Sequence, residues 1–116
     1  MDFYISFNED IVNLRRETRN LMRSINASLP AQAHISWLTD YIARQMLVTG
    51  GKGSLMMVDT VEQEGRCGIK IVCEGEWLKG IGPFYQMHLI PALSRKDEVS
   101  FSNNSQHPQM SIVSWV

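Results

Sequence analysis

Phosphate binding is the first chemistry that the sequence suggests, through the glycine-rich run Thr49-Gly50-Gly51-Lys52-Gly53-Ser54. A Walker A loop needs an earlier glycine where Met46 stands, and a Ser or Thr directly after the lysine, where Gly53 stands. Phosphate loops also lead from a strand into a helix N-terminus, whereas this run follows a predicted helix and precedes a predicted strand. The pattern therefore argues against a nucleotide site of the Walker type.

Histidine and cysteine are the other side chains that commonly serve as metal ligands, bases or nucleophiles. His34, His88 and His107 have no paired-ligand spacing, so we interpret them as ordinary polar side chains. Cys67 and Cys73 fall in one predicted strand, where an extended chain holds them about 20 Å apart, beyond the reach of a disulfide. We expect both to be free thiols that pack on one face of a sheet.

Four arginines are concentrated on the first predicted helix, at positions Arg15, Arg16, Arg19 and Arg23. The apolar residues of this helix recur at helical spacing and are expected to face a sheet, which leaves the arginines facing solvent. Two interpretations remain open. The arginines form either a plain solvated face or a surface that binds an acidic protein partner or a second copy of the chain.

Composition limits the classes of function. The chain has 116 residues, 44% of them apolar and 20% charged, with a net charge of −1. It is long enough for one domain, residues 1–116, and it carries no positive excess for nucleic acid or an anionic membrane. The apolar stretches are far shorter than the ~20 residues of a membrane span, and the acidic start lacks the basic region of a signal peptide. These features predict a cytoplasmic protein.

The elements that must position these residues follow from periodicity and turn signals. We expect a short strand within 4–7, then two amphipathic helices at 9–26 and 30–48, of which the second is largely buried. A hairpin of strands 54–61 and 67–74 follows, then a glycine-rich loop at 75–83 and a shorter helix at 84–93, in which Pro91 makes an unbroken helix doubtful. Strands at 98–102 and 110–115 close the chain. This order predicts an α+β two-layer sandwich with a mixed, mostly antiparallel sheet and helices on one face.

The same order, and several short segments, resemble the GHKL ATPase fold and, within it, the small anti-sigma serine kinases of bacterial stress-response partner-switching modules. The likeness spans most of the chain. It rests on the segments Ala43-Arg44-Gln45, Gly51-Lys52-Gly53, Gly68-Ile69-Lys70-Ile71-Val72 and Lys96-Asp97-Glu98-Val99, and on Trp115 near the end.

The resemblance implies a nucleotide site whose key positions have changed. Gln45 stands where that family has its magnesium-binding Asn, and Tyr41 stands where it has an acidic residue. With one inserted residue, Glu76 falls at the position of the adenine-binding Asp and Gly80 at that of a following glycine. The family's glycine-rich lid has no counterpart. We therefore expect a degenerate site with no catalytic residue, no metal and no resident cofactor, and ATP with Mg²⁺ only if Gln45 and Glu76 act as substitutes.

These observations predict a non-catalytic regulatory module that binds a protein partner of a signalling or anti-sigma pathway, or forms a homodimer, with no nucleic-acid or membrane role. The former nucleotide cleft is expected to be filled by the apolar side chains of Trp77, Leu78, Ile81 and Phe84. Two alternatives stay open. One is an ATP-dependent anti-sigma serine kinase with atypical site residues, and the other is a self-associating or small-ligand-binding α+β domain of unrelated descent.

Overall fold

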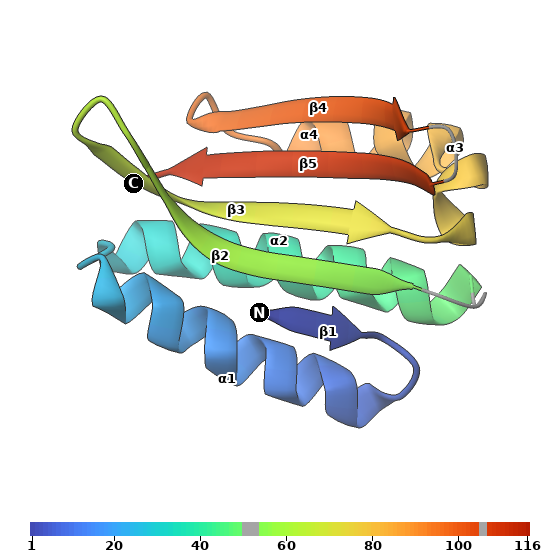
Figure 1. The fold of residues 1–116 in the computed structure, drawn as a ribbon, viewed down its shortest axis with the longest axis horizontal. Helices are drawn as coiled ribbons and strands as arrows, with labels where there is room; N and C mark the ends of the chain where they lie inside the picture. The colour runs from blue at the N-terminus through green and yellow to red at the C-terminus, as the bar shows by residue number, and fades with distance from the viewer. Residues whose placement is uncertain (50–53, 105–106) are drawn as a thin grey trace.

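A computed structural model describes residues 1–49, 54–104 and 107–116. They form two layers, with helices packed on one face of a five-stranded sheet (Figure 1). The predicted α+β two-layer fold is therefore confirmed. The glycine-rich run at 50–53 and residues 105–106 lie outside the described part of the chain.

Helix α1 (Asn8–Ser24) and helix α2 (Leu29–Thr49) lie close to the positions predicted from their apolar periodicity. The start of α1 is fixed by Asp10, whose carboxylate accepts the backbone N–H groups of Ser6 at 2.9 Å and Phe7 at 2.8 Å. This contact satisfies amides just before the helix and places a negative charge at its positive end. It also explains why the first strand, β1 (Asp2–Tyr4), ends before the predicted 4–7 segment does.

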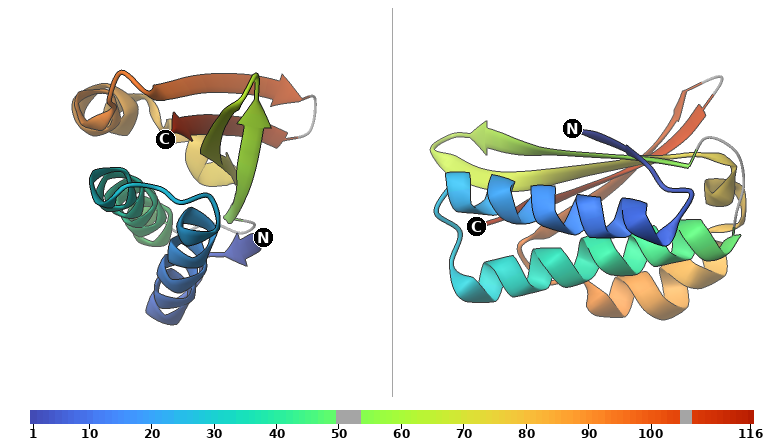
Figure 2. Two further views of the ribbon diagram at one scale, coloured as in Figure 1. Left: turned by 90° about the vertical axis from the view of Figure 1, so that its left-hand side faces the viewer. Right: turned by 90° about the horizontal axis from the view of Figure 1, so that it is seen from below.

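A third helical stretch runs without a break through α3 (Gly82–Phe84), the π-helical turn η2 (Tyr85–Leu89) and α4 (Ile90–Ala92). We call it the 82–92 segment. The N–H of Ile90 donates to the carbonyl of Tyr85, five residues back, and this wider turn directly precedes Pro91. Pro91 therefore does not interrupt the helix as the sequence suggested. Figure 2 shows α2 lying between α1 and the 82–92 segment in one helical layer.

The sheet has the order β1-β2-β3-β5-β4. Its remaining strands are β2 (Leu55–Gln63), β3 (Arg66–Glu74), β4 (Asp97–Asn104) and β5 (His107–Trp115). All four pairings among these described strands are antiparallel, which corrects the expectation of a mixed sheet. Glu64 and Gly65 make the two-residue turn between β2 and β3, and both adopt the positive φ angles, 53° and 78°, that such a turn needs.

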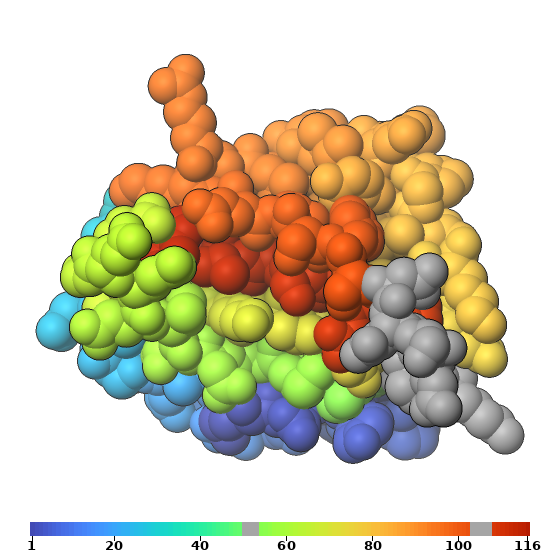
Figure 3. Space-filling view, turned by 45° about the horizontal axis from the view of Figure 1, so that its top comes forward, coloured from blue at the N-terminus to red at the C-terminus, as the bar shows by residue number. Residues whose placement is uncertain are grey.

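The core lies between the sheet and the helical layer. Alternate residues of the strands face the helices, among them Val58, Ile71 and Ile112, which are neighbours across β2, β3 and β5 and are buried. Cys73 is buried and Cys67 half-buried on this face, and both are free thiols as expected. Figure 3 shows the opposite face, where β2, β3, β5 and β4 lie side by side with no helix over them.

Candidate functional site

The sequence-predicted nucleotide positions come from two elements. Gln45 is half-buried on α2, whereas Glu76 and Gly80 are exposed at the two ends of the 3₁₀-helix η1 (Glu76–Gly80). In Figure 1, the gold-coloured chain that follows β3 lies at the end of the molecule where α2 also ends. A Cβ built on Gly80 would meet no heavy atom within 4 Å, so this glycine lies in open space.

Aromatic rings connect α2 with the 82–92 segment. Tyr41, at the position where the resemblance implies an acidic residue, stacks on Trp37 with ring centroids 4.9 Å apart and an interplanar angle of 18°. Its ring also contacts Phe84 at 5.4 Å and the edge of His88 at 6.3 Å. We call these four residues the aromatic ridge. Trp37 forms its outer end and remains 49% exposed.

The apolar residues expected to fill the former cleft are buried or partly buried. Trp77, Leu78 and Phe84 belong to the core, and Ile81 packs against it. The indole N–H of Trp77 donates to the Glu74 carbonyl at 3.2 Å, so η1 is tied to the end of β3. Among the described residues, these side chains bring apolar atoms to this end of the molecule.

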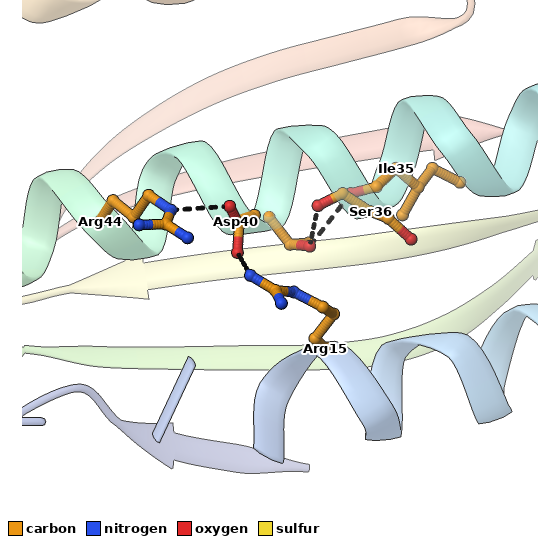
Figure 4. A network of polar contacts seen from close by, with 6 residues as sticks. Arg15, Ile35, Ser36, Asp40 and Arg44 are labelled. Atoms are coloured by element: carbon orange, nitrogen blue, oxygen red, sulfur yellow. Dashed lines mark hydrogen bonds and ion pairs between the residues drawn. The ribbon is translucent and has the colours of Figure 1, made fainter. Parts of the chain in front are cut away.

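Arg15 faces solvent only in part, because 42% of its side-chain surface is exposed and its head group is held in an ion pair. Its guanidinium donates to Asp40 on α2 at 2.5 Å, and Arg44 donates to the second oxygen of the same carboxylate at 2.8 Å (Figure 4). The sequence did not predict this pair, which forms because α1 and α2 pack against each other. Arg16, Arg19 and Arg23 remain exposed on α1, and Arg16 bonds only its neighbour Asn13 among the described side chains.

The two arginines lower the pKa of the Asp40 carboxyl. Partial burial alone would raise the pKa of its carboxyl, but the hydrogen bonds and charges of Arg15 and Arg44 outweigh burial and lower it. The same α2 turn is held by Thr39, whose hydroxyl donates to the carbonyls of Ile35 and Ser36, both at 3.1 Å (Figure 4). Within this network, the Arg15–Asp40 pair links α1 to α2, and the contacts of Thr39 and Arg44 lie within α2.

A second polar cluster forms near the start of α2, where sequence reasoning expected nothing. Nε2 of His34 lies 2.7 Å from a carboxylate oxygen of Asp97, the first residue of β4. The side chain of Asp97 has no exposed surface, and the same oxygen accepts the backbone N–H of Ser94 at 2.8 Å. The turn that leads into β4 and the first part of α2 are thus joined through one buried carboxylate.

Burial would raise the pKa of Asp97, yet hydrogen bonds from Ser114, the backbone of Ser94 and His34 together lower it. Ser114 is the cross-strand neighbour of Asp97 on β5. The second carboxylate oxygen, Oδ1, has no well-formed hydrogen bond within the described chain. The carboxylate is therefore charged, buried and held mainly through one of its two oxygens.

From the sequence alone, His34 is interpreted as an ordinary polar residue. Asp97 stands there only within the segment Lys96-Asp97-Glu98-Val99, one of those on which the resemblance to the GHKL fold rests. The two residues are separated by 63 positions, and no local pattern reports a contact over that separation. Within the described residues, no group of three or more His, Cys, Asp and Glu side chains is arranged to hold a metal ion. In the same part of the chain, none of the helices combines the length and apolar character that crossing a membrane requires.

Comparisons of this chain with family models, with curated proteins and with solved structures each find no match.

Proposed function

We propose that this chain is a non-catalytic regulatory module that binds a protein partner, built on a scaffold of the GHKL ATPase type. The aromatic ridge is the observation that carries the proposal. A magnesium–nucleotide site needs oxygen ligands and phosphate donors, and Mg²⁺ demands near-ideal octahedral geometry. One turn before Gln45, α2 carries Tyr41, whose ring stacks on Trp37 and contacts Phe84.

The ridge also supports the binding half of the proposal. Trp and Tyr dominate the energetic centres of protein interfaces, and Trp37 presents half of its surface to solvent from a rigid stack on Tyr41. Helix α2 is apolar over much of its circumference, which is typical of a helix that is covered on more than one side. Val48, also exposed on α2, adds to this apolar character.

The proposed partner is acidic, and the module works in the cytoplasm within a signalling or anti-sigma pathway. Arg16, Arg19 and Arg23 are exposed on one helix and, unlike Arg15, have no ion pair among the described residues. Arginine forms bidentate pairs with carboxylates, so such a row suits an acidic surface. A second copy of the chain is the alternative occupant.

Calorimetric titration with Mg-ATP tests the non-catalytic half. We expect no saturable binding up to about 1 mM nucleotide. Submillimolar binding would favour the alternative kinase, in which Gln45 and Glu76 substitute for the missing ligands, and a Gln45→Ala variant would then lose it.

Charge reversal tests the binding half. Affinity capture from the native host is compared for the wild type, for Arg16→Glu with Arg19→Glu, and for Lys79→Glu with Arg95→Glu. The second pair changes the net charge equally at exposed positions on other elements. We expect the arginine pair to weaken recovery of an acidic partner, or self-association in sedimentation, by about 2 kcal/mol or more if these arginines are desolvated. Equal recovery by all three proteins would show that the arginines are a solvated surface.

A further inference from the structure

A cavity of about 320 Å³ opens at the start of α2, beside the His34–Asp97 pair. It lies between the first turns of α2, the turn that precedes β4 and the end of β5. In Figure 1 this end of the molecule lies opposite the end that holds η1 and α3. Its size falls at the lower end of the range for small-molecule sites.

The polar side chains that line this cavity are donors or neutral groups. Lys96 brings an ammonium, Ser28 and Ser94 bring hydroxyls, and His34 brings its ring. Asp97 is not one of the lining residues, and its fully buried carboxylate lies 2.7 Å from Nε2 of His34. The lining residues therefore favour a negative group over a positive one.

The helix geometry adds to this preference. The first turn of α2 contains no acidic residue, so the helix's own side chains leave its positive end without a negative partner. Ser28 accepts the N–H of Ala31 at 3.3 Å, which keeps this turn closed beside the cavity. Lys96 in turn is held by its backbone, since its N–H donates to Ser94 and its carbonyl accepts the N–H of Trp115.

The rest of the wall is mostly apolar. Pro30, Ala31 and Trp115 line it together with Ser114, and Trp115 is only 7% exposed. The guanidinium of Arg66 lies 4.3 Å from the centre of the Trp115 ring and fixes it by a cation–π contact. The indole N–H of Trp115 has no acceptor in the described part of the chain, which is uncommon for a buried donor.

We propose that this cavity binds a small organic acid, with its carboxylate beside Lys96 and Ser94 and its apolar body against Pro30, Ala31 and Trp115. In this arrangement Asp97 is a positioning residue that holds the His34 ring by one nitrogen and directs the other away from itself. The inference goes beyond the proposed function and does not depend on it, because none of the residues that line the cavity belongs to the aromatic ridge.

Phenylacetate is the probe for the test, titrated into the ¹⁵N-labelled protein to about 10 mM and followed by NMR and calorimetry. We expect saturable shifts of the Trp115 indole N–H and of the amides of Ala31 and Lys96. The neutral analogue 2-phenylethanol should bind about tenfold more weakly, since it lacks the charge that Lys96 meets. Phenyl phosphate should bind no more tightly than phenylacetate.

Lys96→Met keeps the aliphatic stem, and we expect it to lower phenylacetate affinity about tenfold. Lys79→Met, an exposed lysine on η1, is the matched control and should bind as the wild type does. Unfolding curves of both variants check that the fold is kept. The proposal is overturned by the absence of saturable shifts, by equal binding of Lys96→Met, or by equal binding of 2-phenylethanol. Tighter binding of phenyl phosphate would overturn the choice of a carboxylate head group.

Discussion

Arg15 of α1 donates to Asp40 of α2 at 2.5 Å, and this ion pair joins the two long helices side by side. The side chains are 42% and 24% exposed, so water screens the pair only in part. Arg44 reaches the same carboxylate from within α2, four residues on.

A double-mutant cycle with Arg15→Met and Asp40→Asn should give a coupling energy of about 0.5–1 kcal/mol in urea unfolding. The corresponding cycle for Arg44 and Asp40 is the control, and about 0.3–0.5 kcal/mol is expected for an exposed pair within one helix. High salt should reduce both values. A coupling no larger for Arg15 than for Arg44 would mean that the tertiary pair contributes little to helix packing.

Thr18 and Thr39 form a natural comparison, because both are buried threonines on helices. The hydroxyl of Thr18 has no partner among the described residues, whereas that of Thr39 bonds two carbonyls. Thr18→Val should therefore stabilise the protein by about 1 kcal/mol, since it removes a buried unpaired group. Thr39→Val should not. The same sign and size for both variants, measured by thermal unfolding, would show that the Thr18 hydroxyl is satisfied in solution.

Gly68 on β3 is a position where a side chain does not fit. An added Cβ would lie 2.7 Å from the backbone oxygen of Ser114 and 3.0 Å from the Trp115 ring. Gly68→Ala should lower the free energy of unfolding by about 1–3 kcal/mol, because a backbone atom must move. Gly80→Ala, in open space, is the control and should have almost no effect. Equal stability of the two variants would refute the close approach of β3 and β5.

The lowered pKa of Asp97 sets a direction for acid sensitivity. A carboxylate with a lowered pKa in the folded state stabilises the protein at every pH above the ordinary value of about 3.9, and this contribution is lost as the pH falls through the lower, folded-state value. Asp97→Asn should therefore be less stable than the wild type at neutral pH, with a smaller loss of stability on acidification. Urea unfolding at several pH values measures this, and parallel curves for the two proteins would contradict it.

The fold was largely predictable because its signals are local. The helical spacing of residues such as Leu14 and Leu38 marks both long helices, and Glu64-Gly65 is a recognisable hairpin turn. Several details were missed. All pairings among the described strands are antiparallel, so the sheet is not mixed. The capping role of Asp10 ended β1 early, and the π-helical turn before Pro91 kept the helix intact.

The polar sites were much harder to predict, because they depend on which elements meet. Arg15 looked like the other arginines of α1, and only the approach of α2 gives it Asp40 as a partner. His34 and Asp97 meet because the helical layer covers the start of β4, and neither residue has a distinguishing neighbour in sequence. Periodicity reports which face of an element is buried, but it does not report which elements become neighbours.

The position of β3 at the centre of the sheet, between β2 and β5, has a consequence for the dynamics of the backbone. Amide protons of β3 residues such as Ile71 are bonded to strands that are themselves paired on their other side, so deuterium can reach them only when the whole domain opens. The outer strands β1 and β4 can detach without breaking the rest of the sheet. Native-state hydrogen exchange should thus proceed from the edges inward, with the half-lives of the β3 amides reporting global unfolding.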